Sequence, residues 1–206
     1  MFNRKGCSVK FKLIVPILLL FHTVGFNMPN GVNEIESKID RLLNKMSLQD
    51  KIGQMCQRSG ADWNYDGVKA GKIGSILNAV DPEKIKKLQK LAVEESPHGI
   101  PLLIARDVIH GFRTIFPIPL GLAATWNTEL IEQGAHVAAS EAASVGINWT
   151  FGPMMDISRD PRWGRIAESF GEDHYLTSQM AVAMIKGLQS DDLTKPDASR
   201  KQSSEL

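Results

Sequence analysis

The sequence has no excess of charge of either sign. Its 24 Lys and Arg residues nearly balance 23 Asp and Glu residues, so the net charge is +1 over 206 residues. Nucleic-acid-binding domains usually show a clear basic excess on one face, and the balance here argues against a nucleic-acid partner. The densest group of lysines, in residues 84–90, is flanked by Glu83, Glu94 and Glu95. Such mixed charge is typical of a solvated helix face.

Cysteine is nearly absent, and motifs for metals and cofactors are missing. Cys7 lies in a segment expected to be removed, which leaves Cys56 alone, unable to form an intrachain disulfide. Cys56 stands in a stretch of helical apolar spacing, so we expect a buried, unreactive thiol. No His-Glu-x-x-His or comparable ligand spacing occurs, and no Gly-x-Gly-x-x-Gly follows the first predicted strand. We therefore expect neither a metal nor a cofactor.

No apolar run is long enough for a comfortable membrane span. The longest runs over nine residues, from Leu13 to Phe21, whereas a transmembrane helix needs about 20. Four basic residues precede this run: Arg4, Lys5, Lys10 and Lys12. This arrangement predicts a secretory signal peptide over residues 1–26, cleaved between Thr23 and Asn30, and a secreted or periplasmic protein with no membrane contact afterwards. The alternative is an uncleaved membrane anchor.

Helix-like and strand-like segments alternate after a short linker at residues 27–34. Helical apolar spacing predicts helices, and short apolar runs bounded by Gly or Pro predict buried strands. The predicted helices span residues 35–46, 48–55, 82–95, 128–143 and 174–189, and the predicted strands span 71–78, 101–105 and 146–153. This alternation is typical of βα units around a parallel sheet.

Acidic residues follow the predicted strands directly. They are Asp81, Asp107 and the charged stretch 156–168. The carboxyl ends of parallel strands carry the chemistry in a (β/α)₈ barrel and in a doubly wound sheet. A closed barrel needs eight strands and about 250 residues. We therefore predict an α/β fold that is part of a TIM (β/α)₈ barrel, about its first three βα units, over residues 35–189. Residues 190–206 are polar and expected to be unstructured.

Several motifs carry a resemblance to a known family. They are Asp107-Val-Ile-His-Gly111, Phe116-Pro-Ile-Pro-Leu120, Trp126, Glu141-Ala-Ala-Ser-Val-Gly146, Asn148-Trp-Thr-Phe-Gly-Pro-Met-Met-Asp156, Arg159-Asp-Pro-Arg-Trp-Gly-Arg165 and Glu168-Ser-Phe-Gly-Glu-Asp173. On these motifs the chain resembles the N-terminal domain of glycoside hydrolase family 3, of the β-glucosidase type, over residues 35–192. The long Arg-Asp-Pro-Arg-Trp-Gly-Arg run makes the resemblance specific.

The resemblance implies a retaining exo-acting glycosidase. Such an enzyme hydrolyses O-glycosyl bonds and releases terminal β-D-glucosyl residues from a β-linked oligosaccharide or glucoside. It implies that Asp107 and Arg165 bind the sugar in the first subsite, where a carboxylate accepts and a guanidinium donates hydrogen bonds. The structural alternatives are a helix N-cap or loop salt bridge for Asp107, and an ion pair with Glu168 or Asp160 for Arg165.

Further candidates surround these two residues. We expect most of the charged ones to orient Arg165, as supporting groups do. The group comprises Trp163, Arg159, Asp160, Arg162, Glu168, Asp156 and His110. Asp156 is placed equally well in the pocket or at a strand end, and a structural hydrogen bond is favoured for His110. Trp63, Trp126, Trp149 and Trp163 could stack on a sugar ring, although core burial is the more common fate of tryptophan.

The catalytic residues that the resemblance implies are absent from the sequence. A retaining glycosidase needs a nucleophile and an acid/base about 5 Å apart. The family's nucleophile is the Asp of a Ser-Asp-Trp type motif, whereas Ser190-Asp191 is followed here by Asp192. We therefore expect a truncated domain that is inactive alone. The alternatives are a catalytically inactive sugar-binding remnant of a truncated gene and, within the family, a β-N-acetylglucosaminidase, which the His110-Gly111 pair disfavours.

The predicted signal peptide can be tested on the exported protein. Because the apolar run is too short to anchor a helix comfortably, the mature chain should begin between Thr23 and Asn30. Intact-mass measurement of protein recovered outside the cytosol checks this. A mature chain that still begins at Met1 would establish the uncleaved anchor instead.

Overall fold

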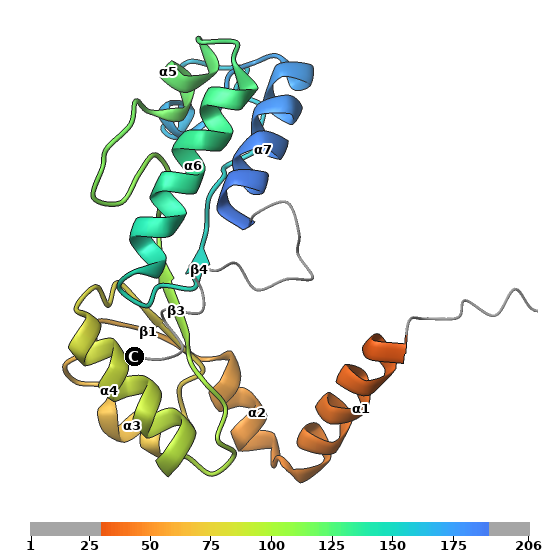
Figure 1. Cartoon of the computed structure of the whole chain (residues 1–206), viewed down its shortest axis with the longest axis vertical. Helices are drawn as coiled ribbons and strands as arrows, with labels where there is room; N and C mark the ends of the chain where they lie inside the picture. Colours follow the sequence, from red (N-terminus) through yellow and green to blue (C-terminus); the bar gives the residue numbers. More distant parts are fainter. Residues whose placement is uncertain (1–29, 190–206) are drawn as a thin grey trace, which may run out of the picture. The chain divides into compact units, whose positions relative to one another are not determined.

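The computed structural model describes residues 30–189 of the chain (Figure 1). The predictions for the signal peptide and for residues 190–206 lie outside the described residues. The chain divides into two compact units, Met1–Asn44 and Lys45–Leu206, and each is described by itself. Within the described range, every helix is too short or too polar to cross a membrane.

The described part of the first unit is helix α1 (Asn30–Lys45). It confirms the helix predicted from the apolar spacing, but it begins inside the stretch predicted as a linker at residues 27–34. The linker boundary was placed too late because the first turn carries no apolar periodicity. Along α1, Glu34 and Lys38 form an ion pair of 2.8 Å, one helical turn apart.

The second unit contains a parallel four-stranded sheet in the order β1-β2-β3-β4. The strands are β1 (Gln57–Ser59), β2 (Ser75–Leu77), β3 (Leu103–Arg106) and β4 (Trp149–Thr150). Ile76 pairs with Ile104, and Ala105 pairs with Trp149. A strand order without reversal is that of successive βα units in a barrel, whereas a doubly wound sheet reverses its order. The sheet confirms the three predicted strands and adds β1, which was not predicted.

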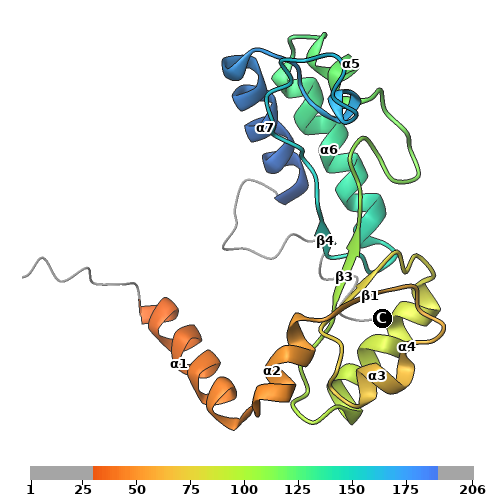
Figure 2. The same ribbon diagram turned by 180° about the vertical axis from the view of Figure 1, so that it is seen from behind.

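Helices connect the strands along the sheet (Figures 1 and 2). In chain order they are α2 (Leu48–Met55), α3 (Tyr65–Lys69), α4 (Pro82–Lys90) with its π-helical continuation η1 (Leu91–Glu95), α5 (Pro119–Ala123), α6 (Thr128–Ala143), the 3₁₀ turn η2 (Ile166–Glu168) and α7 (His174–Gln189). Both views show α3 beside α4 and α6 beside α7. The bounds of α6 and α7 are those predicted, while α3 and α5 were missed.

Side-chain caps explain why several helix starts were predictable. Ser47 and Asp50 form a capping box: the Ser47 N–H donates to Asp50 Oδ2 at 2.9 Å, and the Asp50 N–H donates to Ser47 Oγ at 3.2 Å. The Ser47 hydroxyl, which donates to Asp50 Oδ2 at 2.7 Å, His98 and the Ser47 N–H together lower the pKa of Asp50 to about 2. Asn127 accepts from Leu130 N–H at 3.0 Å and starts α6 in the same way. Cys56, expected to be buried, is half-buried instead because it ends α2.

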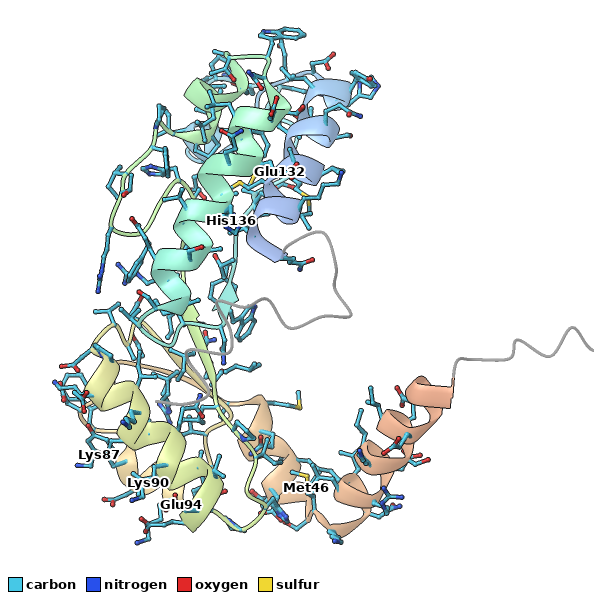
Figure 3. All side chains as sticks on the ribbon, viewed as in Figure 1. Met46, Lys87, Lys90, Glu94, Glu132 and His136 are labelled. Carbon is cyan, nitrogen blue, oxygen red and sulfur yellow. The ribbon has the colours of Figure 1, made fainter. Side chains whose placement is uncertain are left out.

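Two clusters of buried side chains form the core. The first joins β2 and β3 to α3, α4 and α6, and Ile76, Leu88 and Ile104 have no exposed surface in it. The second joins α5, α6 and α7 around Phe170 and Met180. Each fully buried large side chain contributes about 1.5–3 kcal/mol. The charged side of α4 lies outside this packing, with Lys87, Lys90 and Glu94 along it, as predicted for a solvated face (Figure 3).

The opposite face of the sheet is only partly covered by the described residues. Side chains alternate along a strand, so Leu103 and Trp149 point away from the cluster that holds Ile104. Leu103 is 49% exposed and Trp149 is 37% exposed. In a barrel this face is the interior, so these side chains mark where further strands would close the core.

Substituting alanine for either of two glycines in the packed helices α6 and α7 should change the stability of the protein in opposite directions. A Cβ at Gly187 would lie 2.2 Å from the Glu132 carbonyl oxygen, whereas a Cβ at Gly134 meets only Phe116 ring carbons at 3.8–3.9 Å. Gly187→Ala should therefore lower the free energy of unfolding by about 1–3 kcal/mol. Gly134→Ala should raise it by up to about 1 kcal/mol through helix propensity. Urea unfolding of both variants measures the difference, and equal shifts of the same sign would contradict this packing of α6 and α7.

Candidate functional site

The candidate site lies where β3 and β4 end, and side chains extend their short pairing. The Ile104 N–H donates to Asn148 Oδ1 at 2.8 Å, just before β4 begins. The Val108 N–H donates to Thr150 Oγ1 at 3.2 Å, beyond the end of β3. The two segments therefore stay together over more residues than the backbone ladder alone covers. This pairing sets the position of Asp107 relative to the chain that leaves β4.

Asp107 follows β3 directly and is exposed. The preceding Arg106 donates from Nη1 to Asn78 Oδ1 at 2.7 Å, and Asn78 N–H donates to the Ala105 carbonyl at 2.9 Å. Asn78 has a φ of +64°, which Asn tolerates better than most residues. These bonds tie the carboxyl ends of β2 and β3 together beside Asp107. Neither Arg106 nor Asn78 was among the predicted residues, although an Asn directly after a buried strand is a turn signal.

A buried hydroxyl pair holds the loop after β4. Ser158 donates to Ser169, and Ser169 donates in turn to the Ile166 carbonyl at 3.0 Å. The backbone adds a bond from Ser158 N–H to the Gly171 carbonyl at 3.0 Å. Both serines are buried. The loop from 158 to 171 is thus closed at its base, and Arg165 lies near its tip.

Arg165 is held by Glu168 on the same loop. Its Nε donates to Glu168 Oε1 at 3.2 Å and its Nη2 donates to Oε2 at 2.8 Å. This fork uses two of the five N–H donors of a guanidinium and leaves three for a ligand. The ion pair with Glu168 raises the pKa of Arg165, and the negative charges of Asp156 and Asp107 raise it further. Asp107 and Asp156 therefore lie within electrostatic range of Arg165, and all three side chains are exposed.

The other predicted charged residues on this loop are arranged differently. Asp160 and Arg162 pair with each other at 2.6 Å rather than with Arg165. Within the described residues, Arg159 is exposed and forms no ion pair. Trp163 is half-buried, and its backbone N–H donates to the Asp160 carbonyl at 3.0 Å. Of the predicted supporting group, Glu168 thus contacts Arg165, whereas Asp160 and Arg162 form a separate pair.

His110 contacts backbone rather than another candidate. Its Nδ1 lies 2.9 Å from the Phe116 carbonyl oxygen. Because a carbonyl only accepts, Nδ1 must carry the proton. This contact is of the structural kind that the sequence favoured for His110.

The exposed tryptophans and the two cavities lie away from Asp107 and Arg165. Trp63 is 80% exposed and Trp126 is 75% exposed, so the common expectation of core burial is wrong for both. One cavity of about 500 Å³ runs beside β1 and is lined by Trp63 and Arg58; another of about 320 Å³ is lined by His110 and apolar residues of α6. Neither cavity is lined by Asp107 or Arg165. In residues 30–189, no group of three or more His, Cys, Asp or Glu side chains could hold a metal ion.

Comparison with known proteins identifies relatives of this arrangement. A family model described as the glycosyl hydrolase family 3 N terminal domain matches residues 47–196. The chain is 45% identical over 168 residues to a periplasmic β-glucosidase of Salmonella typhimurium, covering 79% of this chain and 22% of that protein. It is 34% identical to a β-xylosidase of Formosa agariphila, covering 78% of this chain and 19% of that protein.

A solved structure supports the same relationship. The β-glucosidase from Listeria innocua in complex with glucose superimposes with a TM-score of 0.69 at 36% sequence identity, over 76% of this chain and 24% of that chain. The chain thus spans about a fifth to a quarter of the length of these relatives. The four parallel strands correspond to part of a TIM-barrel-like domain, as the sequence predicted.

The two Arg–carboxylate pairs of the loop allow a matched test of the site geometry. Glu168→Gln should release the Arg165 guanidinium, so its Nε–H signal in ¹H–¹⁵N spectra should broaden, while the Arg162 signal stays unchanged. Asp160→Asn is the control: it should broaden the Arg162 signal and leave the Arg165 signal unchanged. Arg165 lowers the pKa of Glu168 below its ordinary value of 4.5, so the wild-type pair persists at neutral pH and weakens only as pH falls below that value. An Arg165 signal insensitive to Glu168→Gln would contradict the pairing.

Proposed function

Because the chain belongs to glycosyl hydrolase family 3, we propose that it forms part of the first sugar subsite of a β-glucosidase-type enzyme. In this proposal Asp107 and Arg165 bind the terminal β-D-glucosyl residue of a β-linked oligosaccharide or glucoside. It is supported by the position of Asp107 directly after β3 and of Arg165 on the loop that leaves β4, within electrostatic range of each other, so that the negative charge of Asp107 adds to that which raises the pKa of Arg165. Substrates of barrel enzymes bind at this end of the strands.

The charges of the site suit a neutral, hydroxyl-rich ligand. The Asp107 carboxylate only accepts hydrogen bonds, whereas the free N–H groups of Arg165 only donate. A sugar hydroxyl does both, so neighbouring hydroxyls of one pyranose can satisfy the two residues together. Glucose is favoured as that sugar because the relatives include β-glucosidases, one of them solved with glucose. A pentose is the second candidate, since a β-xylosidase is also among the relatives.

Hydrolysis needs groups beyond those in the 206 residues. Hydrolysis with retention of the anomeric configuration requires two carboxylates about 5 Å apart, one on either side of the scissile bond. The Ser-Asp-Trp type motif of the family's nucleophile is not present in this sequence. The role we assign to these residues is therefore binding and orientation of the sugar, and a sugar-binding protein without hydrolytic activity is the alternative function.

We place the protein outside the cytosol. The apolar run that follows the basic residues near the N-terminus is typical of secretion. The similar protein of Salmonella typhimurium is named as periplasmic. A β-linked oligosaccharide released outside the cell is a substrate available in that compartment.

Binding of glucose to the full 206-residue chain tests the proposal. We expect weak binding, with a Kd of millimolar order or above, detectable by ligand-observed NMR. Asp107→Asn and Arg165→Ala should each weaken it by about tenfold, because each removes a charged hydrogen-bond partner. Asp66→Asn and Arg162→Ala are controls that make the same changes elsewhere.

Two results would contradict the proposal. One is a site whose binding of glucose is unaffected by either substitution. The other is hydrolysis of an aryl β-glucoside by the purified chain at ordinary enzyme rates, which would require a nucleophile that the proposal does not assign to these residues.

A further inference from the structure

The carboxylate of Glu141 closes a loop that begins at Asp107. Glu141 Oε2 accepts from the Arg113 N–H and the Thr114 N–H, both at 2.8 Å. Its Oε1 accepts from the Thr114 hydroxyl at 2.6 Å. Two successive backbone N–H groups aimed at one oxygen form an anion-binding turn, and charge-assisted bonds of this length are strong. The tip of the loop is therefore fastened to the end of α6.

The base of the same loop is fastened to itself. Phe116 N–H donates to the His110 carbonyl at 2.8 Å, and His110 Nδ1–H donates back to the Phe116 carbonyl at 2.9 Å. Gly111 and Ile115 form an isolated bridge between these ends. A Cβ at Gly111, where φ is +119°, would lie 2.0 Å from the Thr114 carbonyl oxygen. The backbone is thus tightly folded from His110 to Phe116, and the His110 ring is bonded to the far end of the turn that carries residues 113 and 114.

Glu141 itself is a fixed point. The next residue of α6, Ala142, is buried in the first core cluster together with Ala138. The loop also starts from a fixed point, since Val108 is 1% exposed and donates to Thr150. Asp107 and His110 therefore lie on a segment held by the sheet at one end and by Glu141 at the other. Removing the Glu141 support leaves the segment held at Val108 and by the bonds between His110 and Phe116.

We propose that Glu141 is a positioning residue for the sugar site, which fixes the orientation of His110 and the placement of Asp107 through residues 113 and 114. For Asp107 the proposal rests on the sugar role assigned above, whereas its effect on His110 does not. Glu141 would not touch the sugar. Its three hydrogen bonds, the Thr114 hydroxyl first, also lower the pKa of Glu141, so the carboxylate stays charged and able to accept all three at neutral pH.

The imidazole of His110 reports this positioning without any ligand. In the wild-type chain, long-range ¹H–¹⁵N spectra should show the Nδ1–H tautomer of His110, because Nδ1 donates to Phe116. Glu141→Gln replaces one accepting oxygen by an NH₂ group, and it should shift His110 toward the Nε2–H tautomer. Glu132→Gln is the matched control, since it removes the same charge from the same helix more than two turns away (Figure 3). His136, exposed on α6, is the internal reference and should not change in either variant.

Sugar binding supplies the second readout. Glu141→Gln should raise the Kd for glucose about threefold to tenfold, whereas Glu132→Gln should leave it unchanged. A folded Glu141→Gln chain that keeps the His110 tautomer and the Kd would overturn the proposal, since a purely stabilising contact affects neither. If Glu141→Gln does not fold, Thr114→Val removes only the 2.6 Å hydroxyl contact and decides by the same two readouts. A tautomer shift in a chain that binds no glucose would refute the proposed function and leave the positioning role of Glu141 for His110 established.

Discussion

The pairing of β3 with β4 is the constraint on which the candidate site depends. The backbone ladder is short, with Ala105 opposite Trp149 and Arg106 opposite Thr150. Asp107 lies one residue past this ladder on one side, and the loop with Arg165 leaves from the other. A slip of one residue would turn the side chains of β4 to the opposite face and separate the two groups. The bonds from Ile104 and Val108 to Asn148 and Thr150 oppose such a slip, because each fits only the observed register.

The charge distribution narrows the chemistry that this pairing permits. One guanidinium, that of Arg165, interacts with three carboxylates, those of Glu168, Asp156 and Asp107. A cation would compete with Arg165 for the same oxygens. A neutral ligand that both donates and accepts hydrogen bonds is compatible with these charges, in keeping with the sugar role proposed for Asp107 and Arg165.

The parts of the fold that could be predicted are those whose reasons are local. The helices at residues 128–143 and 174–189 were predicted with their observed bounds; the first is rich in the helix formers Ala and Glu and is capped by Asn127. Strand β1 was missed because Gln57, Arg58 and Ser59 are polar and exposed, so no apolar run marks it. The third predicted strand shortened to two residues for a different reason: the chain beyond Thr150 finds no further ladder partner among the described residues.

The candidate site, too, could be predicted only where the reasons are local or carried by a motif. The resemblance indicated Asp107 and Arg165, and the negative charge of Asp107 is among those that raise the pKa of Arg165. Their supports were harder to predict, because they depend on contacts between residues far apart in the chain. Arg106 meets Asn78 across 28 positions, and Glu141 meets Thr114 across 27. Spacing patterns within one helix or strand carry no information about such contacts, and tertiary packing alone decides them.

The exposure of the candidate site to solvent limits how strongly its residues can bind a ligand. Asp107, Asp156 and Arg165 all face solvent, and at the surface water and salt screen each interaction. The sheet face with Leu103 and Trp149 is likewise only partly covered by the described residues. Further strands closing over that face would exclude water, and the same hydrogen bonds would gain strength in the lower dielectric. In the proposed sugar site, Asp107 and Arg165 would thus contribute the direction of the hydrogen bonds more than the strength of binding.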